Sequence, residues 1–319
     1  MKLLVQSMAL VAVIGLVAFF VSGYIDPGLL YLLSEALLLL FMAQMWNLLA
    51  GYGGMVSMGH QAFVGLGAYL FFALANFGVL PVGAALPVAA LAVGLMALPL
   101  GLLLFRLRNA YFSVAIWVVA EILVILFSKF SALGGTGGMT LRPDGGNLDL
   151  PLEQYVFAIA LFSCVGFTLA MRWVLARPTG LAILAVRDNE DAAQAAGVNV
   201  QKLHLALFAI SAAGCAWAGS LYYANVLYLT PTDAFQINWV IGMMFIAVVG
   251  GIGTLTGPVI GTVIFIGLRE LLTSFGFSGS IYWIVMGLIV IVTLVYAPRG
   301  LWPALHSLFR RMSIERKSA

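Results

Sequence analysis

Apolar residues run in long stretches along this chain, and glycine, proline or charged residues separate one stretch from the next. Each stretch is long enough for a helix that crosses the hydrocarbon core of a bilayer, which takes about 20 residues. Runs such as Leu29–Phe41 and Ile281–Val295 do not alternate every second residue, which argues against a transmembrane β-barrel. The pattern predicts an all-α integral membrane protein with ten spans, near 3–22, 29–50, 58–77, 83–105, 111–130, 155–175, 203–225, 237–252, 257–275 and 281–297.

The first stretch has some features of a signal peptide. Lys2 precedes the apolar run, and Val21-Ser22-Gly23 is small enough for cleavage. The run from Leu3 to Val21 is longer than the ~7–15 apolar residues of a signal peptide, so we expect a helix that is retained.

Lysine and arginine residues gather in alternate connections, which sets the expected orientation. If the chain starts in the cytoplasm, the inner side receives Lys2, Arg106, Arg108, Arg172, Arg177, Arg187, Lys202, Arg299, Arg310, Arg311, Arg316 and Lys317. The outer side receives Lys129, Arg142 and Arg269. We therefore expect both termini in the cytoplasm, with a short basic tail (301–319) against anionic lipid headgroups.

Composition and motifs narrow the class of function. Only 8% of the residues are Asp, Glu, Lys or Arg, against roughly 25% in soluble domains, so a water-soluble enzyme is excluded. The sequence has no P-loop, dinucleotide-binding glycine motif, HExxH or CxxC, and His60, His204 and His306 lie far apart. We expect no catalytic residue, no metal, no cofactor bound by this chain and no nucleic-acid partner.

The longer inner connection, 177–202, has the features of a short helix. Asp188 or Asn189 can cap it, acidic residues occupy its first turn, and Gly197 can end it. Two interpretations remain open: a helix that docks a partner on the cytoplasmic face, and a solvated connector with good helix propensity.

Several polar side chains fall inside predicted spans. Glu121 lies near the middle of its span, where an ionised carboxylate is costly, while Gln44 and Asn47 share one helix face and Glu35 lies half a turn out of phase with Gln44. The glycine-rich stretch Gly51–His60 predicts either a loop or a broken, re-entrant helix. The candidate translocation-pathway residues are Gln44, Asn47, Ser57, His60, Gln61 and Glu121. Interhelical hydrogen bonding is the alternative role for them.

Small residues recur every fourth position in one later span, at Ala212, Ala216, Ser220 and Ala224. Such a face lets a neighbouring helix approach closely, either inside the bundle or at a subunit interface.

The inner connection also carries a family resemblance. Asp191-Ala192-Ala193-x-x-x-Gly197 resembles the EAA-x-x-x-G loop of ABC importer permeases, with Asp in place of Glu, and its surroundings are similar to the LivM-type branch. Further family-like stretches lie along nearly the whole chain: Gly51–Phe63, Arg108–Phe112, Ala120–Ile122, Gly134-Gly135, Gly250–Pro258 and Pro298–Leu301.

This resemblance implies a single transmembrane permease domain over 1–319 with the ABC importer permease fold, in the bacterial inner membrane, importing branched-chain amino acids. It implies a LivH-like second permease, two cytoplasmic ABC ATPase subunits that use ATP, and an extracytoplasmic substrate-binding protein. The ATPase-coupling element is then expected at Glu190, Asp191, Ala192, Ala193 and Gly197.

Alternatives remain. Urea and amide importers belong to the same family, and the pairing of unlike or like permeases stays open. A proton-coupled secondary carrier with Glu121 or Glu35 as its titrating group would explain the intramembrane carboxylates, but not the inner loop.

Overall fold

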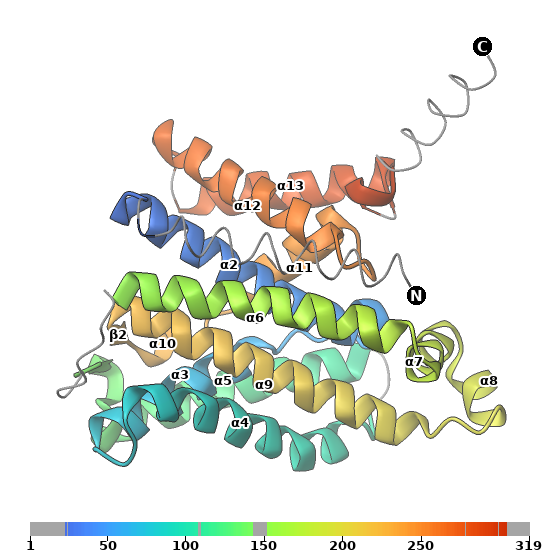
Figure 1. Ribbon diagram of the computed structural model, residues 1–319, viewed down its shortest axis with the longest axis horizontal. Coiled ribbons are helices and arrows are strands. Elements are labelled where there is room, and N and C mark those ends of the chain that lie inside the picture. The colour runs from blue at the N-terminus through green and yellow to red at the C-terminus, as the bar shows by residue number, and fades with distance from the viewer. Residues whose placement is uncertain are drawn as a thin grey trace.

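The computed structural model describes residues 23–304 except 24, 108–109, 143–151, 278 and 299, and these residues are mainly helical (Figure 1). In chain order the elements are α2 (Pro27–Asn47), the π-helical turn η1 (Leu48–Tyr52), α3 (Gln61–Asn76), α4 (Val82–Leu104), α5 (Ala110–Lys129), the 3₁₀ turns η2 (Ser131–Leu133) and η3 (Gly135–Gly137), β1 (Met139–Thr140), α6 (Leu152–Leu175), α7 (Pro178–Asp188), α8 (Glu190–Ala195), α9 (Val200–Val226), β2 (Tyr228–Leu229), α10 (Pro231–Ala234), α11 (Asn238–Gly250), α12 (Gly257–Ser274) and α13 (Ser280–Tyr296). The expected span 3–22, together with Arg108, Arg299 and the tail beyond residue 304, lies outside the described residues.

Eight helical segments of the described chain are long and apolar enough to cross a membrane. They are Pro27–Tyr52, Val82–Leu104, Ala110–Lys129, Leu152–Leu175, Val200–Val226, Pro231–Gly250, Gly257–Ser274 and Ile281–Ala304. Six of them coincide with one expected span each to within a few residues. Pro231–Gly250 starts earlier than expected because it includes the short helix α10, and Ile281–Ala304 ends later because a helical turn follows α13. The prediction of a helical membrane protein is confirmed. The total of ten spans and the cytoplasmic position of both termini stay predictions.

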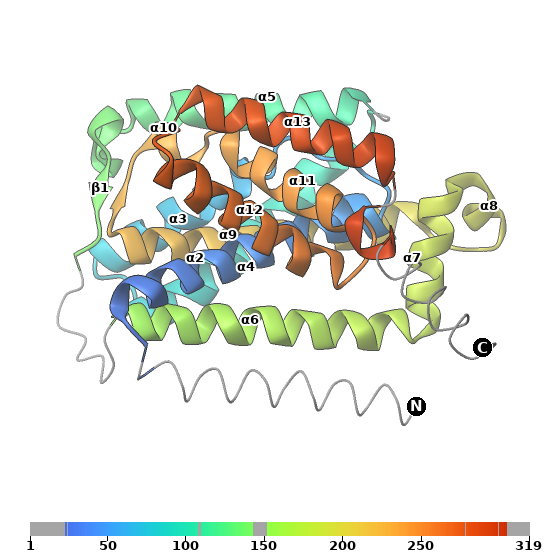
Figure 2. The ribbon, with the colours of Figure 1, turned by 90° about the horizontal axis from the view of Figure 1, so that it is seen from above.

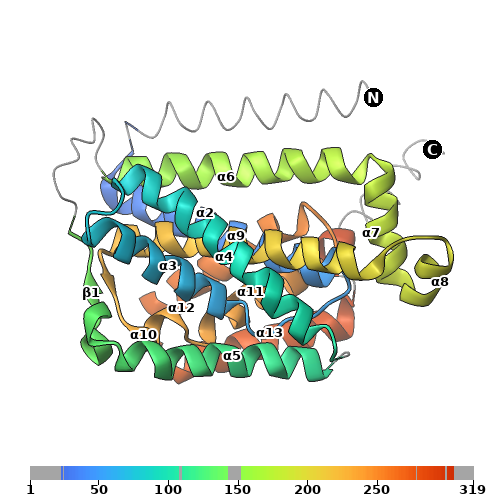
Figure 3. The ribbon, with the colours of Figure 1, turned by 90° about the horizontal axis from the view of Figure 1, so that it is seen from below.

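The expected span 58–77 contains a shorter helix, α3, because the chain before it is not helical. We call residues 53–60 the unwound segment. It begins where the Gly53 carbonyl accepts a hydrogen bond from His204 Nε2 (3.2 Å), and it ends where His60 bonds to Ser211 (2.6 Å). From residue 204 to residue 211 a helix rises about 10 Å, so the unwound segment runs into the bundle along α9 and α3 starts inside it. Figure 3 shows α3 only in the half of the bundle farther from α8. Of the two alternatives, the glycine-rich stretch is therefore a broken helix, not a loop outside the bundle.

The long helix α9 packs against α2, α3, α4 and α6. Its small residues Ala212, Ala216, Ser220 and Ala224 are all buried. Close approach is visible at Gly67 of α3, where an added Cβ would collide with the Ala216 backbone. The structure thus places this small face inside the bundle, where van der Waals contact holds helices together in lipid.

Helices α11, α12 and α13 form a second layer on the other side of α2 (Figure 1). At one end of the bundle α7 and α8 project beyond the other helices, and at the opposite end β1 and β2 form a two-stranded antiparallel ladder with Met139 opposite Leu229 (Figure 2). The helix ends divide the basic residues as expected: Arg106, Arg172, Arg177, Arg187 and Lys202 lie toward α7 and α8, and Lys129, Arg142 and Arg269 lie toward the ladder.

Candidate functional site

Helix α8 is short but capped at both ends. The Asn189 side chain accepts a hydrogen bond from the Ala192 N–H (3.0 Å), so Asn189 is the cap and Asp188 ends α7. At the other end Gly197 has φ +89°, and the N–H groups of Gly197 and Val198 bond back to the carbonyls of Gln194 (2.9 Å) and Ala193 (3.0 Å). This is the Schellman pattern, which needs a left-handed residue at the position of Gly197. Six residues would not hold a helix alone, so these caps define its shape.

The surface of α8 is almost entirely exposed. Ala193 is 3% exposed and anchors the helix, whereas Glu190, Asp191 and Ala192 are all exposed. Two acidic groups in the first turn also suit the positive end of the helix dipole. Of the expected coupling residues, Glu190, Asp191 and Ala192 therefore form an outward-facing acidic turn, Ala193 anchors the helix and Gly197 ends it.

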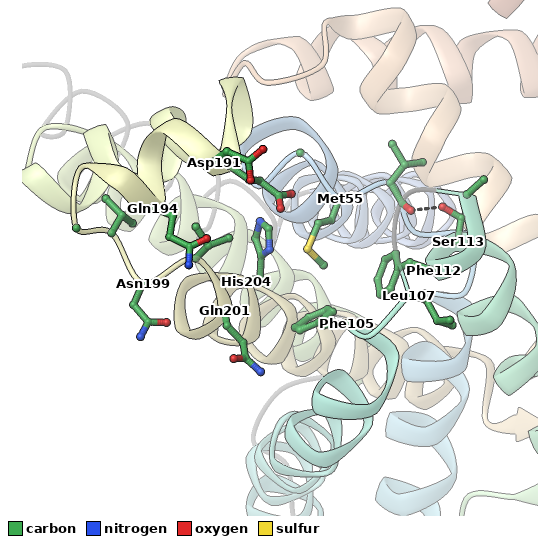
Figure 4. A pocket seen from close by; sticks show the side chains of 17 residues that line it. Met55, Phe105, Leu107, Phe112, Ser113, Asp191, Gln194, Asn199, Gln201 and His204 are labelled. Carbon is green, nitrogen blue, oxygen red and sulfur yellow. Dashed lines mark hydrogen bonds between the residues drawn. The ribbon is translucent and has the colours of Figure 1, made fainter.

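A cavity of about 1190 Å³ lies beside α8 (Figure 4). Asp191, Gln194 and Gln201 line one side, and the other side is lined by the apolar side chains of Phe105 and Leu107 from the α4–α5 connection and of Phe112 from the first turn of α5. Pockets for small ligands are typically about 300–1,000 Å³, so this space slightly exceeds the usual range.

The same region contacts the unwound segment. A Cβ added to Gly54 would lie 3.4 Å from Arg187 Cα, so the end of α7 rests on this glycine. Met55 and Val56 line the cavity, and the Val56 carbonyl accepts a hydrogen bond from Ser113 of α5. The loop 177–202 and the unwound segment are therefore in direct contact.

His60 is the centre of a buried hydrogen-bond network at the inner end of the unwound segment. Ser211 Oγ donates to the Met45 carbonyl of α2 (2.7 Å), so its one hydrogen is used and His60 Nε2 must donate to it (2.6 Å). In the neutral ring Nδ1 then accepts from Ser57 Oγ (2.8 Å). Ser57, His60 and Ser211 are all 0% exposed. The network joins the unwound segment to α2 and α9.

Two of the amide side chains expected along a pathway, Asn47 and Gln44, have partners of their own, and the third, Gln61, has none among the described residues. Asn47 bonds to the Thr254 carbonyl (2.9 Å) and the Gly253 N–H (2.8 Å), and so ties α2 to the α11–α12 connection. Gln44 Nε2 donates to Thr168 Oγ1 of α6 (3.4 Å). Among the described residues, Gln61 is fully buried and neither atom of its carboxamide has a hydrogen-bond partner. The structure thus brings Ser57 and His60 together, but not all six candidates.

The two intramembrane carboxylates lie apart. Glu121 is exposed on α5 and accepts a hydrogen bond from Trp117 Nε1 of its own helix (3.0 Å). Glu35 is half-buried and makes a bidentate ion pair with Arg269 of α12 (2.6 and 2.7 Å).

Comparison with known proteins identifies the family. Residues 28–294 match the family model described as branched-chain amino acid transport system / permease component. The chain belongs to this permease family. The resemblance to LivM-type permeases drawn from the inner loop is therefore confirmed, and the permease is a multi-pass membrane protein.

Individual relatives are identical to the permease at about a quarter of the aligned positions. The LivM permeases of the high-affinity branched-chain amino acid transport systems of Escherichia coli (strain K12) and Salmonella typhimurium (strain LT2) are each 24% identical over 283 residues, 81% of this chain. The matched region is 66% of the length of those relatives. The galactose/methyl galactoside import permease MglC of Haemophilus influenzae is 26% identical over 224 residues, 65% of either chain. No solved structure matches the permease.

The sequence alone did not reveal two side-chain contacts of the permease: the hydrogen bond from His60 to Ser211 and the ion pair of Glu35 with Arg269. Ser211, which completes the His60 network, lies 151 residues away in a helix noted only for its small residues. Arg269 was counted with the outer helix ends, yet an arginine within an apolar span calls for a carboxylate partner, and Glu35 in another span was a candidate. That pairing could have been found.

Proposed function

We propose that this chain is a permease subunit of an ATP-driven importer for branched-chain amino acids in the bacterial inner membrane. Its partners are a LivH-like second permease, two cytoplasmic ABC ATPases and an extracytoplasmic substrate-binding protein. The ATPases hydrolyse ATP and drive this chain between inward-facing and outward-facing states through the loop 177–202.

Support for the substrate class comes from the LivM relatives, which match over 81% of the chain. The MglC relatives, one of them 33% identical over 131 residues, favour sugar import as a second candidate. Uptake of labelled leucine and galactose by cells that express the complete transport system separates the two.

The observation that carries the coupling proposal is α8. It is a capped helix with an exposed acidic first turn, and it lies next to a large cavity at the end of the bundle. Because α7 rests on Gly54 of the unwound segment, a displacement of this loop reaches the segment directly. ATPases that bind one conformation of the loop more tightly shift the population of permease states.

Gly197 offers a test of α8 that leaves the side chains of α8 itself unchanged. A Cβ at Gly197 would meet nothing within 4 Å in this chain, so a substitution strains the backbone without a steric clash inside the permease, and a second substituted variant controls for the added side chain. A left-handed conformation costs most L-residues roughly 1–2 kcal/mol, whereas asparagine tolerates it. We expect Gly197→Val to weaken ATPase association and substrate-stimulated ATP hydrolysis, and Gly197→Asn to retain both.

Both variants are purified with their partner subunits, and co-purified ATPase is measured alongside hydrolysis. Gly166→Val, at another glycine whose Cβ would meet nothing within 4 Å, is the matched control in α6. Wild-type assembly and hydrolysis in Gly197→Val would rule out α8 as the coupling element.

A further inference from the structure

A second cavity, of about 200 Å³, lies at the end of the bundle opposite α8. It is lined by the middle of α2 and of α12, the last turns of α9, the first turns of α11 and α13, and Gln236 just before α11. We call it the ion-pair pocket, because Glu35 and Arg269 form part of its wall. It holds about six or seven waters at ~30 Å³ each and lies below the usual range for drug-sized ligands, so it suits a small solute.

The charged wall of the ion-pair pocket has spare bonding capacity of both kinds. Of the five N–H groups of Arg269, the hydrogen bonds in the described structure use four, to Glu35 and to the exposed Glu270, which leaves one on Nη1. Each oxygen of Glu35 accepts one bond from Arg269 and has a further lone pair. The wall can therefore donate to an anionic group and accept from a cationic group at once.

Most of the remaining wall is aromatic, and Leu39, Gly242 and the amides Gln236 and Asn238 complete it. Tyr222 and Trp239 meet edge to face with ring centroids 4.7 Å apart, and Phe265 and Tyr282 meet in the same way at 6.3 Å. Rings locked against one another present a rigid apolar surface, which favours an aliphatic group of matching size.

We propose that the ion-pair pocket binds a zwitterionic amino acid with an aliphatic side chain. The α-ammonium group lies on Glu35, the α-carboxylate lies on Arg269, and the side chain lies between the aromatic rings. A pair of opposite charges has little net attraction for a singly charged solute, whereas a solute with both charges satisfies both partners. This inference rests on the proposed import of branched-chain amino acids, and it adds a recognition site within the permease itself.

Gly242 of α11 allows the pocket to be filled without disturbing the ion pair. It lines the pocket, and an added Cβ would lie 3.5 Å from the Phe265 ring, which is ordinary contact. Gly242→Leu therefore starts without a clash, and its longer atoms occupy the binding space. Gly267→Leu on α12, where a Cβ would meet nothing within 4 Å, is the matched control.

The charges are tested together, because removal of one partner would leave the other half-buried and unpaired. The double variant Glu35→Gln/Arg269→Gln removes both, and Glu270→Gln is its control, since Glu270 bonds the same guanidinium outside the pocket lining. Binding of labelled leucine, at up to millimolar concentration, is measured on the full permease complex in nanodiscs without the substrate-binding protein. Two leucine analogues compete: 4-methylpentanoate, which lacks the ammonium group, and 3-methylbutylamine, which lacks the carboxylate.

We expect wild type, Gly267→Leu and Glu270→Gln to bind leucine alike, and Gly242→Leu and the double variant to bind at least about tenfold more weakly. Both analogues should also compete at least about tenfold more weakly than leucine. Equal leucine binding in Gly242→Leu and Gly267→Leu overturns the site, and an analogue that competes as well as leucine overturns the zwitterion assignment. If wild-type cells import leucine but the purified complex binds no leucine in this pocket, this inference alone is refuted. Wild-type cells that import galactose and not leucine refute the proposed function as well.

Discussion

The His60 network predicts a measurable difference between two buried serines of α9. Ser211 links three parts of the structure, because its Oγ accepts from His60 and donates to the Met45 carbonyl of α2. Ser220 is equally buried at 0% exposure, but its Oγ donates only to the Ala216 carbonyl one turn back in α9 (2.8 Å). We therefore compare Ser211→Ala with Ser220→Ala.

The expected changes in the free energy of unfolding follow from these contacts. Ser211→Ala removes two hydrogen bonds between separate segments, and interhelical hydrogen bonds in membrane proteins average about 0.6 kcal/mol each. It also leaves a buried donor on His60 unpaired, which costs about 1–3 kcal/mol. Together these costs give an expected loss of about 2–4 kcal/mol in the free energy of unfolding. Ser220→Ala breaks a bond within one helix, and the better helix propensity of alanine offsets it, so we expect a change within about 0.5 kcal/mol.

The assay is reversible unfolding of the purified full-length chain in mixed micelles with increasing denaturing detergent. The helix-propensity gain from serine to alanine is the same in both variants, so their difference isolates the contribution of the network. A His60→Ala/Ser211→Ala double-mutant cycle then gives the coupling between the two side chains. Equal stability of the two serine variants, or additive effects in the cycle, would show that the network does not hold the unwound segment in place.

Two further substitutions test other contacts. Glu121→Gln should leave leucine uptake unchanged, because the amide keeps the acceptor for Trp117 and the side chain is exposed; lost uptake in transport assays would instead support a titrating carrier. Asn47→Ala should lower the free energy of unfolding by about 1–3 kcal/mol, since the Gly253 N–H and the Thr254 carbonyl lose their partner, and an unchanged denaturation midpoint would contradict this.

The positions of the membrane helices were predictable from the sequence. In lipid every backbone N–H and C=O group needs a hydrogen-bond partner within the same segment, so a long apolar run forms an α-helix. The inner helix was predictable as well, since Asn189 and Gly197 are local signals that act within a few residues.

The interior of the candidate site was not predictable in this way. Whether Gly51–His60 forms a loop or a broken helix depends on side chains of Trp46, Ser113 and His204, which bond its carbonyls from three different helices. Non-helical backbone is tolerated at membrane depth only where such partners surround it. These contacts join residues up to 151 positions apart, and no local pattern encodes them.

The length and packing of helix α9 determine how a displacement at one of its ends affects the other. Its 27 residues contain no proline and rise about 40 Å in total, from Val200 beside the large cavity to the turns around Tyr222 in the ion-pair pocket. Close packing against α2, α3 and α4 along its length leaves it little freedom to bend. A displacement of its first turn would therefore have to shift the whole helix together with the helices packed against it, rather than being absorbed by a local bend.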